Sequence, residues 1–415
     1  PQDLLSGGRA GERAGADVAA ENGWAERRKR VARETQRRSV AHAAAGSTDM
    51  AAAPFANLAS VYTDPVRLMA EKARLFGGDM PLLAGLSVDM PKAGDRLLFE
   101  ETGTPIIILR GRDGVARAFL NMCTHRGAKL AADCTPAARL VCPFHAWSFD
   151  LAGKLLALPG ARGFEGHDKA DLGLIPVPCH EWQGMIFVQP RAGAEPVDIE
   201  AFLGDFAPEL AQLELCRAEP VKAGEMRAAS NWKFALDTYG EGYHFATLHA
   251  STIGQTHFND MCVYDRFGRN HRISFPDKGN LALVGVPEAD WPEVDYGGVH
   301  YLFPNTVLFI GSIEPGKGFT QIFRMFPGAT PGEMVTKFAV YAPRGVQSDQ
   351  HRAECEFAFD ATAQVVSTED YVIAAQGWAN MAAAPADFRV IYGANEPAIA
   401  AVQRAIAEGC GMPLA

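Results

Sequence analysis

Two short pairs of cysteine and histidine constrain this chain more than any other feature of its sequence. The first is Cys-Thr-His at positions 123–125, and the second, after sixteen intervening residues, is Cys-Pro-Phe-His at positions 142–145. A zinc finger usually groups Cys with Cys and His with His. Mixed pairs on two facing loops instead suit a [2Fe–2S] cluster in which two Cys bind one iron and two His bind the other. The predicted cluster ligands are Cys123, His125, Cys142 and His145.

Two other interpretations of these pairs stay open. The four residues would also suit a structural zinc site, or they could be unrelated loop residues. Pro143 after the second cysteine and Trp147 just past the second histidine favour the cluster. Cys134 lies inside the same loop and is a substitute ligand. The remaining cysteines show no metal spacing: Cys179, Cys216, Cys262, Cys355 and Cys410.

A second group of candidate ligands follows the segment Asn-Trp-Lys at 231–233. Glu241, His244 and His249 come next, and the two histidines are five positions apart. On an ideal helix these imidazoles would point about 140° apart, so they share a metal only if the helix ends, bends or bulges between them. Two histidines and a distant carboxylate form the facial triad of non-haem Fe(II), which leaves coordination positions open for O2.

Composition excludes several classes of protein. The chain of 415 residues is 48% hydrophobic with a formal net charge of −10, which is ordinary for a globular protein and argues against nucleic acid binding. It contains no apolar run of the ~18–20 residues that a membrane span needs. Eight cysteines are too few for a disulfide framework at this length, and we expect a reducing, cytoplasmic location.

The patterns along the chain predict an α+β fold. Residues 1–49 are rich in Ala and Arg, with a basic run at 27–30, and are predicted to be a disordered or non-native leader or a solvated helix. Short apolar runs separated by turn residues predict an all-β cluster domain over 79–190. Residues 50–78 and 191–415 are predicted to form a larger mixed domain whose antiparallel sheet is covered by helices. Within these domains we expect strands at 97–100, 106–109, 115–120, 147–150, 185–188, 299–309, 319–326 and 334–341, and helices at 197–215, 354–381 and 396–408.

The order of these features resembles the large catalytic subunit of the Rieske non-haem iron oxygenases, over about residues 50–415. The landmarks are the two Cys–His pairs, Asn-Trp-Lys at 231–233, the acidic residue and two histidines that follow, and Asn-Glu-Pro at 395–397. The resemblance implies a Rieske [2Fe–2S] cluster and a mononuclear non-haem Fe(II). It also implies that His244, His249 and a late aspartate bind the mononuclear iron. Asp370 is our choice for that aspartate, Glu369 is the substitute, and Asp360 is a remote third choice.

The same resemblance gives Glu241 a special role. In the family a carboxylate at this place accepts hydrogen bonds from an iron-binding histidine, here His244, and from a cluster histidine, here His145, of a neighbouring chain in a ring of three. The implied assembly is a homotrimer with electron transfer between subunits. The cluster itself would be reduced by a separate ferredoxin or flavin reductase that uses NAD(P)H, because the chain lacks a Gly-rich dinucleotide motif. Whether a small β subunit accompanies the trimer stays open.

These implications predict an oxygenase that uses O2 to hydroxylate an aromatic or other small organic substrate, as in the catabolism of aromatic hydrocarbons. The alternative is an N- or O-demethylating monooxygenase of the same family, toward which Glu241 leans because many ring-dihydroxylating members carry Asp there. A remote alternative is a Rieske electron carrier without catalysis of its own. Candidate apolar walls of a substrate pocket are Tyr239, Phe245, Phe258, Phe309 and Phe357.

Overall fold

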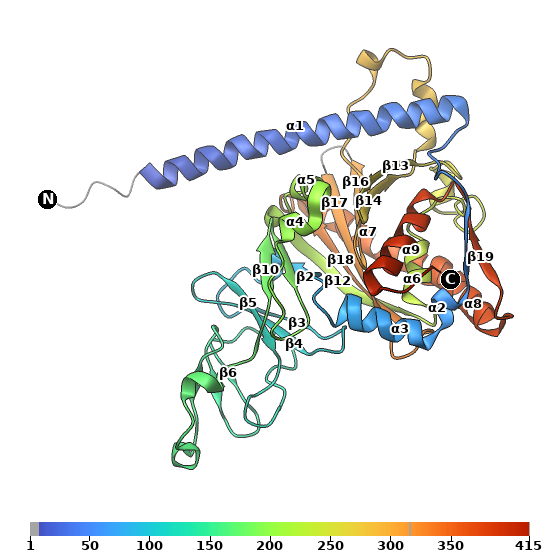
Figure 1. Cartoon of the computed structure of the whole chain (residues 1–415). Coiled ribbons are helices and arrows are strands. Elements are labelled where there is room, and N and C mark those ends of the chain that lie inside the picture. Colours follow the sequence, from blue (N-terminus) through green and yellow to red (C-terminus); the bar gives the residue numbers. More distant parts are fainter. Residues whose placement is uncertain (1–7, 315–316, 415) are drawn as a thin grey trace.

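The computed structural model describes residues 8–314 and 317–414. Figure 1 shows a broad antiparallel sheet flanked by helices, with smaller β units extending from one end of it. The predicted α+β class, with an all-β part ahead of a larger mixed part, is confirmed.

The large sheet has seven strands in the order β12-β18-β17-β16-β15-β14-β13, and every neighbouring pair is antiparallel. The single strand expected over 299–309 is wrong, because the chain turns at Phe303 to Asn305 and forms a hairpin in which Leu302 pairs with Thr306. Proline has no N–H to donate to a sheet, so Pro304 breaks the run. The strands are β12 Glu219–Ala228, β13 Val263–Phe267, β14 Asn270–Ser274, β15 Gly298–Leu302, β16 Thr306–Glu314, β17 Lys317–Pro327 and β18 Met334–Ala342.

Both faces of this sheet are buried. Successive residues of a strand point to opposite faces, and accordingly Val307 and Phe323 belong to one apolar core while Leu308 and Ile322 belong to another. The first core includes residues of α6 to α9, and the second includes residues of α1, α4 and α5. The candidate metal-binding residues of the larger domain lie on the first of these faces.

The helices over that face are α6 Trp232–Asp237, α7 Asp349–Val365, α8 Tyr371–Ala383 and α9 Pro397–Cys410. A π-helical segment, Val366–Asp370, joins α7 to α8, so the helix predicted over 354–381 is continuous but not regular. The helix expected over 197–215 is shorter than predicted. It divides into α4 Ile199–Leu203 and α5 Ala207–Ala211 because Gly204 has a left-handed φ of 54°.

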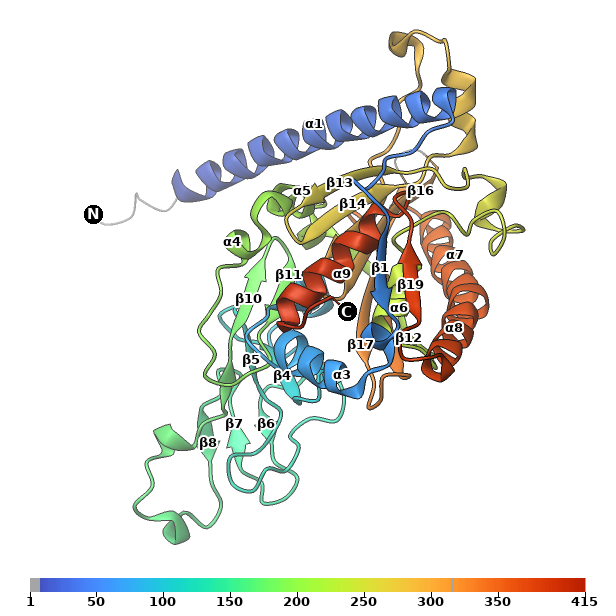
Figure 2. The same cartoon turned by 45° about the vertical axis from the view of Figure 1, so that its right-hand side comes forward.

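The smaller β part contains three sheets: β10-β11-β2, β3-β4-β5-β9 and β6-β7-β8. The last two enclose a core of their own that includes Ile107, Phe119, Trp147 and Phe149. Figure 2 shows β6 to β8 at the lower left, away from α7 and α8 at the right. Their bounds are β2 Leu82–Leu86, β3 Arg96–Phe99, β4 Ile106–Arg110, β5 Ala116–Leu120, β6 Leu140–Val141, β7 Ser148–Phe149, β8 Leu155–Ala157, β9 Pro176–Val177, β10 Cys179–Trp182 and β11 Met185–Val188.

The segment between the N-terminal helix and the small sheets packs with the large domain. β1 Phe55–Leu58 pairs with β19 Arg389–Tyr392, which lies near the other end of the chain. The short helices α2 Ser60–Thr63 and α3 Pro65–Glu71 follow, and Val61 and Tyr62 join a core with Met381 and Ile399.

The N-terminal region differs from its prediction. Residues Gly8–Ala45 form one helix, α1, so a disordered leader is wrong for this stretch, although a helix was the stated alternative. From about residue 24 onward it is not simply solvated, because one side of it, which includes Ala32, Gln36, Ser39 and Val40, is buried against the large domain. None of the helices in the described ranges has the length and apolar character that a bilayer span requires.

Arginines hold α1 in place. Arg28 Nη1 lies 2.6 Å from Glu214 Oε2, and Arg38 Nη1 lies 2.7 Å from Asp265 Oδ1. α1 has few large apolar residues, and these ion pairs help to hold it against the large domain. Their acidic partners are 186 and 227 residues away in the sequence.

Candidate iron centres

The structure brings the four predicted cluster residues together. Cys123 and Cys142 are 1% and 2% exposed, whereas His125 and His145 are only half-buried, and the two imidazole Nδ1 atoms are 3.2 Å apart. The two thiols also interact with each other. Thiols therefore gather on the inner side and imidazoles on the outer side. A [2Fe–2S] cluster requires this arrangement when two cysteines bind one iron and two histidines bind the other.

Rings and backbone amides fix these ligands. Trp147 stacks on His125 with ring centroids 4.9 Å apart, and Phe164 contacts both rings edge-on. Burial acts to raise the pKa of Cys142, but the backbone N–H groups of Phe144 and His145 outweigh it, so the pKa of this thiol is lowered. Amides aimed at a cysteine sulfur stabilise the thiolate form that binds iron.

The Asn-Trp-Lys segment anchors the helix that leads to the second site. Asn231 caps α6 by accepting from Lys233 N at 3.0 Å, and its amide donates to Tyr62 O. Trp232 Nε1 donates to Glu71 Oε2 at 2.9 Å, and the Lys233 ammonium pairs with the same carboxylate. Because both charged groups are at most 1% exposed, this pair joins α6 to α3 in a region without water to replace a lost partner.

We expect Lys233→Met to lower the free energy of unfolding by about 3–5 kcal/mol, because it removes the closer of the two cations of the buried Glu71 and leaves only Arg67, whose Nε lies 3.4 Å from that carboxylate. Thermal unfolding followed by far-UV circular dichroism measures the change. The matched control is Lys222→Met, which removes the cation of an exposed ion pair with Asp360 and is expected to change the stability by less than about 1 kcal/mol. Equal stability of Lys233→Met and the parent chain would contradict the importance of this ion pair.

Beyond α6 the chain is irregular, and this irregularity positions the histidines. α6 ends at Asp237, and the next turns carry Glu241, His244 and His249. The imidazole centroids of His244 and His249 are 4.8 Å apart, and the two rings can approach because the helix ends at Asp237, before both of them, rather than between them. Glu241 accepts from the backbone N of His244 at 3.2 Å, and its other oxygen contacts His244 Nδ1. This contact leaves Nε2 as the free nitrogen of that ring.

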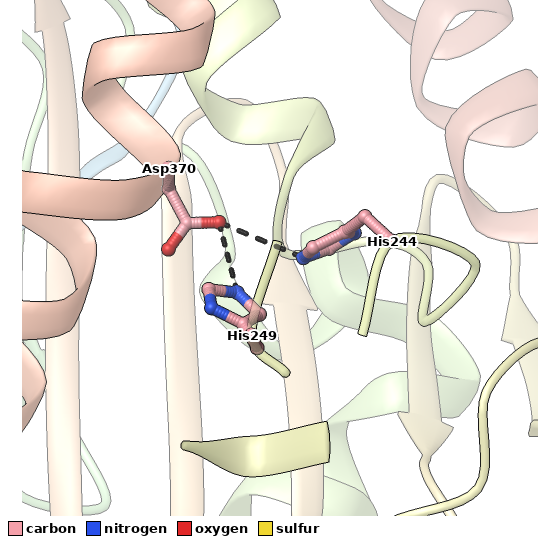
Figure 3. A group of neighbouring side chains, drawn as sticks. All are labelled: His244, His249 and Asp370. Atoms are coloured by element: carbon pink, nitrogen blue, oxygen red, sulfur yellow. Dashed lines mark ion pairs between the residues drawn. The ribbon is translucent and has the colours of Figure 1, made fainter. Parts of the chain in front are cut away.

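Asp370 completes the group from the far end of the chain. Its Oδ1 lies 3.3 Å from His249 Nε2 and 3.6 Å from His244 Nε2, as Figure 3 shows. One ligand atom from each of the three residues lies within 4.8 Å of the other two. Glu369 does not share this position, since its Oε2 contacts His249 Nδ1 at 2.7 Å, on the other side of the ring. Asp360, the third choice, is 62% exposed and pairs with Lys222.

The carboxylates around His249 favour a positive charge at this place. Burial acts to lower the pKa of His249, but the carboxylates of Asp370 and Glu369 outweigh it, so the pKa is raised. His244 Nε2 is buried and has no hydrogen-bond partner. A buried nitrogen without a donor or acceptor is costly, and a metal ion bound by Nε2 would remove that cost.

Comparison with known proteins identifies the family. Residues 81–183 match the model of the Rieske [2Fe–2S] domain, and residues 215–411 match that of the ring hydroxylating alpha subunit (catalytic domain). The chain is 30% identical over 279 residues to a carnitine monooxygenase oxygenase subunit of Acinetobacter pittii, which covers 64% of this chain and 70% of that protein. The chain belongs to the Rieske non-haem iron oxygenases. It is an oxidoreductase that incorporates oxygen from O2, and it works with a separate reductase.

Other relatives of this oxygenase differ in their chemistry. A biphenyl dioxygenase subunit alpha of Metapseudomonas furukawaii is 31% identical over 208 residues, which are 46% of this chain and 45% of that protein. The crystal structure of a quaternary ammonium Rieske monooxygenase in complex with L-carnitine shares the fold with a TM-score of 0.71 at 20% identity, over 87% of this chain and 96% of the other. The family includes both monooxygenases and dioxygenases.

The cofactors of this oxygenase are a Rieske [2Fe–2S] cluster and a mononuclear non-haem iron. The described residues fit both groups. Two buried thiols and two outward imidazoles suit the cluster, and the orphaned His244 Nε2 beside Asp370 suits a single ion bound by nitrogen and oxygen.

A chain of hydroxyl groups behind Asp370 was not predicted from the sequence. Tyr239 and Tyr371 hydroxyls are 3.2 Å apart, and the Tyr371 hydroxyl is 2.6 Å from Thr336 Oγ1. Of the five candidate pocket walls, Phe245 lies edge-on to His244 with centroids 5.1 Å apart, whereas Phe357 is 67% exposed and lies on the surface of α7. Thr336, on a strand far from the motif, carried no sequence signal.

Proposed function

We propose that His244, His249 and Asp370 hold the mononuclear iron and that Cys123, His125, Cys142 and His145 hold the cluster. The observation that carries this proposal is the convergence of three ligand atoms from two distant segments within 4.8 Å of one another, in a chain that has its own Rieske domain. We also retain the division into a cluster domain over 79–190 and a catalytic domain formed by 50–78 and 191–415. The pairing of β1 with β19 supports the second part.

The side chains around the site have separable tasks. When bound, the mononuclear iron supplies O2 activation and the cluster supplies single electrons. Glu241 fixes the ring of His244 through Nδ1 and leaves Nε2 free for the metal. Phe245, 6% exposed, covers one side of the two histidines and excludes water. The hydroxyls of Tyr239 and Tyr371 contact each other near Asp370, and burial together with the charge of Asp370 raises the pKa of Tyr239 and so keeps this hydroxyl protonated.

We further propose that electrons reach the iron from the cluster of a neighbouring chain in a homotrimer. Both views place β6 to β8, beside the cluster residues, well away from α6 and α8 of the same chain. Apolar residues are exposed next to each centre: Phe144 (58%) beside His145, and Tyr243 (61%) beside His244. A solved quaternary ammonium Rieske monooxygenase of this fold is itself described with inter-subunit electron transfer. The donor to the cluster would be a separate ferredoxin or flavin reductase that oxidises NAD(P)H.

Our proposed substrate is a small organic ammonium compound, with hydroxylation of a C–H bond next to nitrogen. Two observations support this class. First, a carnitine monooxygenase oxygenase subunit aligns with this chain over 70% of its own length. Second, Glu241 occupies the position at which many ring-dihydroxylating members of the family carry Asp. In this reaction O2, two electrons and two protons convert the C–H bond into a carbinol and water. The carbinolamine then breaks its C–N bond and releases an aldehyde and an amine.

The cis-dihydroxylation of an arene is the second candidate. The match to a biphenyl dioxygenase subunit alpha favours it. Both oxygen atoms of O2 would enter the ring, so no aldehyde would form. The two candidates therefore differ in a product that is easily measured.

A single-turnover experiment distinguishes them without the unidentified redox partner. Dithionite-reduced, desalted protein is mixed with O2 and a panel of quaternary and tertiary amines or arenes. We expect aldehyde and amine to form in equal amounts, at up to about one per mononuclear iron. A cis-dihydrodiol from an arene, with no aldehyde from any amine, would support the second candidate. Metal analysis that finds zinc instead of iron, or a cluster with no mononuclear iron, would contradict both.

A further inference from the structure

Each of the two imidazoles in the proposed iron site contacts a carboxylate through its Nδ1 atom. His244 contacts Glu241, and His249 contacts Glu369 at 2.7 Å between Nδ1 and Oε2. The two carboxylates come from segments more than one hundred residues apart in sequence. Glu369 therefore contacts Nδ1 of His249 in the same way as Glu241 contacts Nδ1 of His244. Only Glu241 belongs to the sequence motif that precedes the histidines.

The π-helical segment explains how Glu369 and Asp370 reach the same ring. In a helix neighbouring side chains point in different directions, and the imidazole of His249 lies between these two. Glu369 contacts Nδ1, and Asp370 Oδ1 lies 3.3 Å from Nε2. A turn of π-helix over Val366–Asp370 widens the backbone at the end of α7 and carries this pair. Such π-bulges are frequent at functional sites.

The contact decides which nitrogen of His249 can bind a metal. An Nδ1–H that donates to Glu369 leaves the lone pair on Nε2, which faces Asp370 and His244. Turning the ring over would replace both nitrogens with carbons and would break both contacts. The carboxylate of Glu369 is itself held by Thr252, whose Oγ1 donates to Oε2 at 3.4 Å. His249 is 1% exposed, so water cannot take over the role of Glu369 at Nδ1.

We propose that Glu369 is a positioning residue that sets the orientation and tautomer of His249 and so determines how tightly the mononuclear metal is held. The inference rests on the proposed ligand set of His244, His249 and Asp370. A hydrogen-bonded carboxylate behind a metal-binding histidine also makes the imidazole a stronger donor. Glu369 does not touch the metal itself, because its nearest contact lies on the far side of the ring.

Cobalt(II) titration tests the proposal without catalysis. The mononuclear site is stripped of iron with a chelator while the cluster is retained, and Co(II) binding is followed by its visible d–d absorption. We expect Glu369→Gln to weaken Co(II) binding by about 10–100-fold and to alter the band, since an amide accepts the hydrogen bond but adds no charge. Glu369→Asp keeps the charge and should lie between Glu369→Gln and the parent chain. Glu356→Gln, the same change at an exposed position of α7, should bind Co(II) like the parent chain.

The outcomes separate this inference from the proposed function. Co(II) binding by Glu369→Gln with the parent affinity and spectrum would overturn the role of Glu369. Failure of the parent chain to bind Co(II) would instead overturn the ligand set on which the inference rests. Cluster absorption and the thermal unfolding transition verify that each variant is folded. If Glu369→Gln unfolds, the comparison of Glu369→Asp with Glu356→Gln decides: weaker Co(II) binding or an altered band in Glu369→Asp alone supports the role, and the parent affinity and spectrum in Glu369→Asp overturn it.

Discussion

Asp370→Ala is expected to abolish mononuclear iron binding while the cluster remains intact. The substitution leaves only His244 and His249, and two imidazoles in a buried site do not retain Fe(II). Because changes behind the ligands already cost about 10–100-fold in affinity or activity, loss of a ligand should lower turnover by more than about a thousandfold. Iron content should fall from about three to about two per chain. Elemental analysis and the visible spectrum measure both centres in one sample.

The separate packing of the two domains explains why the cluster should survive. Cys123 and Cys142 belong to a core with Trp147 and Phe149, and Asp370 has no place in that core. Asp360→Ala is the matched control, because Asp360 also lies on the long helix but is 62% exposed and pairs with Lys222 at the surface. We expect that variant to keep three irons and its activity. Iron loss in Asp360→Ala, or three irons in Asp370→Ala, would contradict the assignment of the third ligand.

The cluster residues could be predicted from the sequence because their spacing is local. The two Cys–His pairs lie within 23 residues, which restricts the backbone to loops that face each other. The chemistry of the four side chains then suggests a [2Fe–2S] cluster. His244 and His249 were also within reach of sequence reasoning, since helical geometry requires an interruption between them. In the structure the helix ends earlier than that, at Asp237, and both histidines lie on the turns that follow.

Helical periodicity over 354–381 favours Asp370 over Glu369, and the structure corrects that argument in part. A regular helical stripe would place Asp370 on one buried face with Val366 and Ile373. Ile373 is instead 47% exposed, because the π segment shifts the phase of the side chains between α7 and α8. Periodicity cannot anticipate a π-bulge whose stability comes from contacts elsewhere. For the same reason no pattern in the sequence indicated that Glu369 contacts His249.

The position of α1 lay beyond sequence reasoning altogether. A segment rich in Ala and Arg is ordinarily solvated, and its own residues hold no large apolar stripe. Two of its arginines pair with Glu214, between α5 and β12, and with Asp265 on β13, both of which are far away in the sequence. Long-range charge pairing of this kind has no local signature.

Glu241→Gln is expected to block electron transfer to the iron and to lower turnover by about 10–100-fold, as changes behind an iron-binding histidine do. Glu241 is 13% exposed and contacts His244, and it lies near Glu396, which lines a surface hollow together with Tyr243. A neutral amide has only one acceptor oxygen, and its hydrogen bonds are weaker than those of a carboxylate, so it is a poor bridge between two imidazole N–H groups. Rapid mixing of the reduced variant with O2 and substrate should show a cluster that stays reduced, measured per bound mononuclear iron.

Co-expression with a second variant decides whether the path runs between chains. Cys142→Ser removes the cluster but keeps Glu241, and neither variant alone should turn over. In a mixed ring of three, the cluster of a Glu241→Gln chain can face the intact Glu241 of a Cys142→Ser neighbour. Random assembly at equal amounts makes about one quarter of the directed interfaces productive, so we expect about one quarter of the parent turnover.

A path within one chain makes the opposite prediction, because no chain in the mixture has both an intact cluster and Glu241. Mixed assemblies without activity, in which both proteins are shown to co-purify, would contradict transfer between subunits and leave the bridging role of Glu241 without support. Activity near one quarter would instead require that His145 of one chain reaches Glu241 of the next. The half-buried imidazole of His145 and the exposed Phe144 beside it are placed for that contact. The same mixture therefore tests transfer between chains and the role of Glu241 together.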